Sequence, residues 1–158
     1  MATHTAPDHA WLTTSSASGA QLRSLRPDVA ATFFERVIGT CHPSLSRGEA
    51  WGAFKDRSEV VGACAVAEIS ETSVRVQVAV VPERRHLGIG RELVDIAIAH
   101  ATRQGARILI GSHEAGAAGA LGLIASVNLP CARRVRAGQA EVALFLPMSE
   151  PSMQEGCR

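Results

Sequence analysis

Apolar and polar residues alternate along the middle of the chain in a way that predicts strands. Valine occupies every second position from Val74 to Val80, with arginine, glutamine and alanine between the valines. This period of two in β-branched residues predicts a strand, which Pro82 ends. Two earlier stretches, residues 50–55 and 60–69, predict a hairpin around the polar turn at 56–59.

Other segments repeat their apolar residues at helical spacing. Apolar positions recur every three or four residues after Asp28, which predicts a helix over about 28–39 with Asp28 as its N-cap. A second, mostly apolar helix is predicted over about 89–104, with Gly105 as the terminating glycine. A third is predicted over 115–127, weakened by its glycines.

The remaining apolar stretches complete the expected fold. Residues 20–26 and 107–111 predict single strands, and residues 131–136 and 140–146 predict a final pair. Residues 43–49 form a loop or a short helix. The alternating order of strands and helices predicts an α/β fold, in which a single central mixed sheet is flanked by helices on both faces.

Composition limits the domain organisation and the partners. The chain has 158 residues, 46% of them hydrophobic and 20% charged, with a formal net charge of +1. This length fits one domain with a substantial core. The near-neutral charge argues against nucleic-acid or anionic membrane partners, and no apolar run reaches the roughly 20 residues of a membrane span. We expect one domain over residues 19–148 between flexible tails at 1–18 and 149–158.

The cysteines and the missing tyrosine also carry information. The four cysteines are Cys41, Cys64, Cys131 and Cys157, with neither a C-x-x-C pair nor zinc-finger spacing. We expect reduced, mostly buried thiols in a cytoplasmic protein without a metal site, and residues 1–21 show no secretory signal. Tyrosine is absent, which removes one common general acid.

A glycine-rich turn after the valine strand is the segment that points to chemistry. It reads Arg85-x-x-Gly88-x-Gly90 and leads directly into the predicted second helix. Such a turn directs several backbone N–H groups toward one point at a helix N-terminus, where negative charge is favoured. Glycine lets an anion approach the backbone, and arginine adds charge-assisted hydrogen bonds. The predicted ligand is a pyrophosphate; the alternative is a plain turn with solvated arginines. A Walker A loop would need a lysine here, and a dinucleotide fingerprint would need glycine at Leu93.

This segment resembles a known family. The stretch from Val78 to Leu93 is similar to motif A of the GNAT acetyltransferase superfamily, whose signature is [QR]-x-x-G-x-[GA]. The resemblance extends to residues 22–28, which look like the family's first strand and helix start. Residues 51–54 and 60–62 look like its second and third strands. In all it covers about residues 20–147.

The resemblance implies acetyl-CoA as co-substrate and acyl transfer to an amine, without a covalent enzyme intermediate. It implies that the backbone of Val78, Ala79 and Val80 pairs with the pantetheine arm like an added strand. The Val80 N–H would stabilise the oxyanion, and proximity would supply most of the acceleration. The residues that the resemblance assigns to the pyrophosphate are Arg85, His86, Leu87, Gly88, Ile89, Gly90 and Arg91.

The chain departs from the family at its usual proton-transfer positions. Ala115 stands where many members have an asparagine, Gly122 where they have a tyrosine acid, and Ile110 where some have a glutamate. The strand at residues 74–77 also lacks the glutamate that others use as a base.

Two residues are candidate substitutes in catalysis. Ser112 shares a strand face with Ile110 and could hold a water molecule. His113 lies at the end of that strand and has a suitable intrinsic pKa; the alternative, which the sequence favours, is an ordinary loop histidine. Glu68 and Glu71 flank a hairpin and either shape the amine pocket or are solvated. The basic cluster Arg133, Arg134 and Arg136 is expected on an exposed strand edge.

These features favour an N-acetyltransferase that acts on a small-molecule or peptide amine. One alternative is a catalytically weak acyl-CoA-binding module with a regulatory role. Another is a transferase for a bulkier acyl group, with room near Gly122. A homodimer is a further expectation, since dimers are common in the family.

Overall fold

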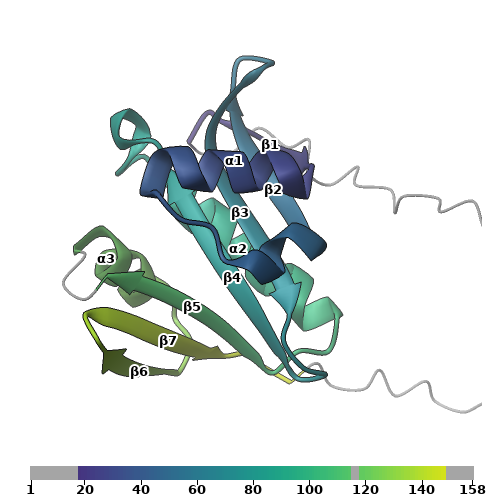
Figure 1. Cartoon of the computed structure of the whole chain (residues 1–158), viewed down its shortest axis with the longest axis vertical. Helices are drawn as coiled ribbons and strands as arrows, with labels where there is room; N and C mark the ends of the chain where they lie inside the picture. The colour runs from purple at the N-terminus through teal and green to yellow at the C-terminus, as the bar shows by residue number, and fades with distance from the viewer. Residues whose placement is uncertain (1–17, 115–117, 149–158) are drawn as a thin grey trace, which may run out of the picture.

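The structure, a computed structural model, describes residues 18–114 and 118–148. Its strands are β1 (Gln21–Leu25), β2 (Glu49–Lys55), β3 (Glu59–Glu68), β4 (Ser73–Val80), β5 (Ile108–Glu114), β6 (Cys131–Arg136) and β7 (Gln139–Phe145). They form a seven-stranded sheet in the order β1-β2-β3-β4-β5-β7-β6 (Figure 1). The β4–β5 pair is parallel and the other pairs are antiparallel. The predicted mixed sheet is therefore confirmed.

Helices cover both faces of this sheet, as the sequence predicts. The helices are α1 (Pro27–Ile38), α2 (Ile89–Arg103) and α3 (Ala118–Ser126), with short 3₁₀ turns η2 (Pro43–Arg47) and η3 (Pro82–Arg84). In Figure 1, α1 crosses in front of the sheet and α2 lies behind it. None of the described helices is long and apolar enough to cross a membrane.

Two different packing surfaces hold α1 and α2 against the sheet. Phe33 and Phe34 of α1 pack on a face made largely of alanine, including Ala63 and Ala65 of β3. Small side chains there let the helix approach closely while its aromatic rings fill the space. On the other face, Leu93 of α2 belongs to a cluster of larger residues. The members of that buried cluster are Ala20, Trp51, Ala53, Val61, Cys64, Val66, Ile89, Leu93, Ile96 and Ala97.

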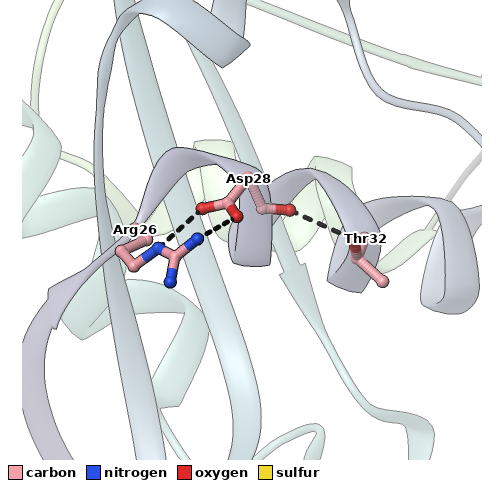
Figure 2. A network of polar contacts seen from close by, with 3 residues as sticks. All are labelled: Arg26, Asp28 and Thr32. Carbon is pink, nitrogen blue, oxygen red and sulfur yellow. Dashed lines mark hydrogen bonds and ion pairs between the residues drawn. The ribbon is translucent and has the colours of Figure 1, made fainter.

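The start of α1 differs from the prediction. Arg26, not Asp28, occupies the N-cap position, because Pro27 takes the first helical position and begins the helix one residue earlier than predicted. The Asp28 carboxylate instead accepts a hydrogen bond from Arg26 Nε at 3.0 Å. The Asp28 backbone carbonyl accepts one from Thr32 Oγ1 at 3.1 Å (Figure 2). Hydrogen bonding to the Arg26 side chain lowers the pKa of Asp28.

The other element boundaries agree closely, with two exceptions at the C-terminal half. β5 continues to Glu114, three residues beyond the predicted end, because it keeps pairing with β7 as far as Glu114 and Gln139. The described part of the third helix spans Ala118–Ser126, while residues 115–117 lie outside the described part of the chain. The expected tails lie almost wholly outside it too, at residues 1–17 and 149–158.

Candidate active site

The two halves of the sheet separate between β4 and β5. The parallel pairing of these strands runs from Ser73 with Ile108 to Val76 with Gly111, and then it stops. Beyond that rung β4 stays paired with β3 as far as Val80, whereas β5 stays paired with β7. The strands consequently diverge, and the wedge between them is plain in Figure 1. The result is an unpaired edge on β4 over Gln77–Val80.

The backbone groups of Val78 and Val80 point into this wedge. The N–H of Val81 donates to the carbonyl of Val61 on β3 at 2.9 Å. Because successive residues of a strand point their polar groups to opposite sides, the N–H and C=O of Val80 and Val78 face away from β3. In agreement, Arg85 Nε donates to the Val80 carbonyl at 3.1 Å. This edge can therefore accept an extended ligand as an additional strand.

A small apolar pocket occupies the wedge. Its volume is about 150 Å³, comparable to roughly five water molecules and sufficient for a short acyl group. Ser112 gives it a hydroxyl, while most of its other walls are aliphatic. The lining residues are Ile38, Val76, Gln77, Val78, Val94, Leu109, Gly111, Ser112, Leu123, Ile124, Val127, Val142 and Leu144.

The glycine-rich turn after β4 forms a concentration of free backbone donors at the N-terminus of α2. Gly88 caps the helix with φ 90°, and His86 has φ 64°. The first helical bond runs from Glu92 N to Gly88 O. Within the described residues, none of the N–H groups from His86 to Arg91 donates to an acceptor. Such a row at a positive helix end is suited to a phosphate group.

The comparisons with known proteins agree with this geometry. A family model described as an acetyltransferase (GNAT) domain matches residues 46–122, which include the unpaired β4 edge and the glycine-rich turn. This stretch of the chain is therefore similar to the GNAT acetyltransferase domain. The resemblance read from the sequence is thereby confirmed. No curated protein sequence matches this chain significantly.

Solved GNAT structures share this fold at low sequence identity. The ribosomal-protein-S18-alanine N-acetyltransferase from Escherichia coli is 18% identical, with TM-score 0.65, covering 85% of this chain and 98% of that chain. The GNAT domain of S. lividans PAT is 14% identical, with TM-score 0.66 and coverages of 84% and 95%. A GNAT family acetyltransferase from Elizabethkingia anophelis with acetyl-CoA bound is 14% identical, with TM-score 0.59 and coverages of 80% and 98%. At these identities the similarity concerns the fold.

Arg85 and Arg91, the two arginines predicted to bind the pyrophosphate, already have protein partners. Arg91 Nε lies 3.0 Å from Asp95 Oδ1, and its Nη1 donates to the Ser126 carbonyl at the end of α3. Its side chain therefore ties α2 to α3, and its backbone N–H is the group it offers at the helix N-terminus. Arg85 is exposed and keeps its terminal nitrogens available beyond the bond to Val80.

The candidate catalytic residues and the positions of the missing family residues differ in exposure and in whether the structure describes their side chains. Ser112 is exposed at the wall of the pocket. The backbone of His113 pairs with Ala140 on β7, but its side chain lies outside the part of the chain that the structure describes, as does Ala115. Gly122 is an exposed residue of α3, and a Cβ there would meet nothing within 4 Å. Ile110 is half-buried in β5.

Gln77 and His42 form a contact at the mouth of the wedge that the sequence analysis missed. Gln77 Nε2 donates to the Thr40 carbonyl at 2.9 Å, and its Oε1 accepts from the His42 N–H at 3.2 Å. Both ends of this amide therefore hold the loop after α1 against β4. His42 Nδ1 in turn accepts from the Ser44 N–H at 3.2 Å and caps η2. The signals in the sequence were a lone glutamine in a valine strand and a histidine before Pro43.

Partial burial and then the positive charge of Arg75 lower the pKa of His42. The lower pKa favours the neutral form of the ring. Because Nδ1 accepts a backbone hydrogen bond, the ring proton is on Nε2.

Other candidates from the sequence lie away from the wedge. Glu68 and Glu71 are exposed at the β3–β4 hairpin, at the opposite end of β4 from the glycine-rich turn. The three arginines of β6 are exposed on the edge strand of the sheet, which confirms that prediction.

The prediction of mostly buried thiols is wrong for one of the three cysteines that the structure describes. Cys64 is buried and Cys41 is half-buried, but Cys131 is exposed because β6 is uncovered. Cys157 lies outside the described residues.

Proposed function

We propose that this protein is an N-acetyltransferase that carries an acetyl group from acetyl-CoA to a primary amine by direct attack in a ternary complex. One observation carries the proposal. The unpaired edge of β4 leads from the free N–H groups at the start of α2 to the apolar pocket in the wedge. This is the arrangement that a ligand with a pyrophosphate, an extended amide-containing arm and a small acyl end requires.

In this proposal the backbone does most of the binding. The pyrophosphate accepts hydrogen bonds from N–H groups between His86 and Arg91, with charge supplied by the free nitrogens of Arg85. The pantetheine amides pair with Val78 and Val80, whose N–H and C=O groups face the wedge. Gly88 leaves the approach open, because a Cβ there would meet nothing within 4 Å. The acetyl group then lies in the 150 Å³ pocket.

The chemical step needs few side chains. The amine nitrogen attacks the thioester carbonyl carbon, the C–N bond forms, and the oxyanion accepts a hydrogen bond from the Val80 N–H. The C–S bond then breaks, the thiolate takes up a proton, and the amine nitrogen loses one to water. Ser112 is our candidate for holding a water molecule that carries a proton here, and His113 is the alternative.

A transferase for longer acyl groups receives less support. The pocket is lined by Leu123 and Ile124 of α3 and by Val127 just after that helix, whereas the open space at Gly122 is on the exposed side of α3. The alternative of a binding module without turnover is distinguished from an enzyme by measuring turnover together with acetyl-CoA binding. A cytoplasmic location and an acceptor drawn from small-molecule or peptide amines belong to the same proposal.

Calorimetric titration with acetyl-CoA is the first test. Wild-type protein should bind it at micromolar concentration, and the Arg85→Ala/Gly88→Ala variant should lose binding. Arg136→Ala on the distant edge strand is the matched control and should bind normally. Failure of the wild type to bind acetyl-CoA would remove the proposal. Binding without turnover on a broad amine panel, followed through free thiol release, would favour the binding module.

A further inference from the structure

The side chain of Arg75 lies on the α1 side of the sheet, beside the wedge. Its neighbours Val74 and Val76 pack into clusters with α2 on the opposite face. Side chains alternate along a strand, so Arg75 and Gln77 point the other way. The hydrogen bonds from Gln77 to the loop after α1 agree with this direction. Arg75 also pairs in register with Ile110, one rung before the strands separate.

Arg75 has no counter-ion in the described part of the chain. No ion pair or hydrogen bond there involves its guanidinium, and its cross-strand neighbours are Ala67 on β3 and Ile110 on β5. The side chain is half-buried rather than extended into solvent. A half-buried guanidinium without a counter-ion is strongly disposed to bind a carboxylate through its planar fork of donors.

The face that Arg75 shares with Ser112 is open to a second substrate. Helix α1 packs against β2, β3 and β4, and in Figure 1 it leaves the front of β5, β7 and β6 uncovered. Phe145 of β7 is 42% exposed. Directly across from Ser112, Glu141 already has its carboxylate 3.0 Å from Arg134, which neutralises that charge.

We propose that Arg75 binds a carboxylate of the amine acceptor, so that the acceptors of this enzyme are small amino acids. The inference rests on the proposed acetyltransferase function. Ser112 follows Ile110 by two residues on the same face, about 7 Å along the strand. A carboxylate held by the Arg75 guanidinium places the amine of the same small molecule toward Ser112 and the acetyl group in the wedge.

The test compares each standard L-amino acid with its carboxamide as acceptor, at saturating acetyl-CoA. The two compounds share the amine and the side chain and differ in the charge that Arg75 would bind. Wild-type enzyme should show kcat/KM about tenfold to a hundredfold higher for its best amino acid than for the amide. Arg75→Gln should remove that preference, mainly through KM for the amino acid, and Arg75→Lys should keep part of it.

Matched controls separate this inference from the proposed function. Arg133→Gln removes a guanidinium from the opposite face of the sheet, since Arg133 pairs with the buried Val142, and it should leave the preference intact. Acetyl-CoA affinity should be unchanged in all three variants. Equal activity on amino acids and their carboxamides, or a preference that survives in Arg75→Gln, would overturn the inference. Normal acetyl-CoA binding and turnover in the same experiment would leave the proposed function unaffected. Absence of acetyl-CoA binding by the wild type would instead remove both. Should Arg75→Gln unfold, Arg75→Lys tests the inference instead: the preference should be reduced by the loss of the planar fork, and an undiminished preference would overturn the inference.

Discussion

Arg85 Nε donates a hydrogen bond to the backbone carbonyl of Val80 across 3.1 Å. Val80 is the last residue of β4, and Arg85 is the first residue of the glycine-rich motif. The bond therefore fixes the turn relative to the unpaired edge of the strand. In the proposed complex the same side chain orders two parts of one ligand site, the pyrophosphate donors and the edge that binds the pantetheine arm.

Replacing Arg85 tests this relationship. Arg85→Met removes the donor and the charge while keeping an unbranched stem, and acetyl-CoA should bind about tenfold more weakly. Arg85→Gln keeps an N–H donor for Val80 and should lose less. Calorimetric dissociation constants measure both, with Arg136→Met as the control. Equal affinity in Arg85→Met and wild type would show that the backbone N–H groups suffice.

The two glycines of the motif should respond differently to alanine. Gly88 has φ 90°, a conformation that alanine adopts at a cost of about 1–2 kcal/mol. A Cβ on Gly90 would lie 3.7 Å from Leu123 and 3.8 Å from Val80, which is ordinary contact. Denaturant unfolding should therefore show a lower free energy of unfolding for Gly88→Ala and little change for Gly90→Ala. A loss of the same size in both variants would contradict the conformational argument.

The sequence predicted the parts of the molecule that depend on local pattern. The valine repeat of β4, the glycine-rich turn and the start of α2 follow from neighbouring residues, and these elements occur where expected. The mixed sheet follows from their order. Asp28 shows the limit of a local rule: it is a favoured N-cap residue, but Pro27 at the first helical position moved the cap to Arg26.

The parts that escaped prediction depend on residues far apart in the chain. Gln77 and His42 are 35 residues apart, and they meet because the loop after α1 crosses β4. Arg91 and Ser126 are also 35 residues apart. The wedge itself exists because β4 remains paired with β3 while β5 remains paired with β7. These pairings depend on several strands at once, so the sequence of a single segment does not predict them.

Thiol labelling should distinguish the cysteines by burial. Complete burial raises the pKa of Cys64 to about 12, and burial with the nearby Glu35 charge raises that of Cys41. A higher pKa leaves less thiolate at pH 8, so Cys64 should react only on unfolding and Cys41 slowly. The exposed Cys131 should react first.

A Cys157→Ser background with a chromogenic disulfide reagent, followed by mass mapping, measures this order. Adding denaturant provides the control, because all three thiols should then react at similar rates. Rapid labelling of Cys64 in the native protein would indicate opening of the sheet where β3 packs against α2.

The charge of Arg75 should be detectable through the titration of His42. Burial and Arg75 lower the pKa of His42 below 6.5, and an Arg75→Gln variant should raise it while leaving it below that value, since the burial remains. Two-dimensional NMR of the imidazole protons measures the change, with Arg133→Gln as control.

The same pKa shift predicts a pH dependence of stability. A native pKa of His42 below its unfolded pKa means that the unfolded state binds the proton more readily. The His42 contribution should therefore reduce stability as the pH falls from about 6.5 through the native pKa, and should be absent from the pH dependence above that window. Because Arg75→Gln raises the native pKa of His42, the pH range over which stability falls should become narrower at its acidic end. If the titration of His42 is unchanged in Arg75→Gln, the Arg75 charge lies away from the loop after α1. It would then also lie away from the mouth of the wedge.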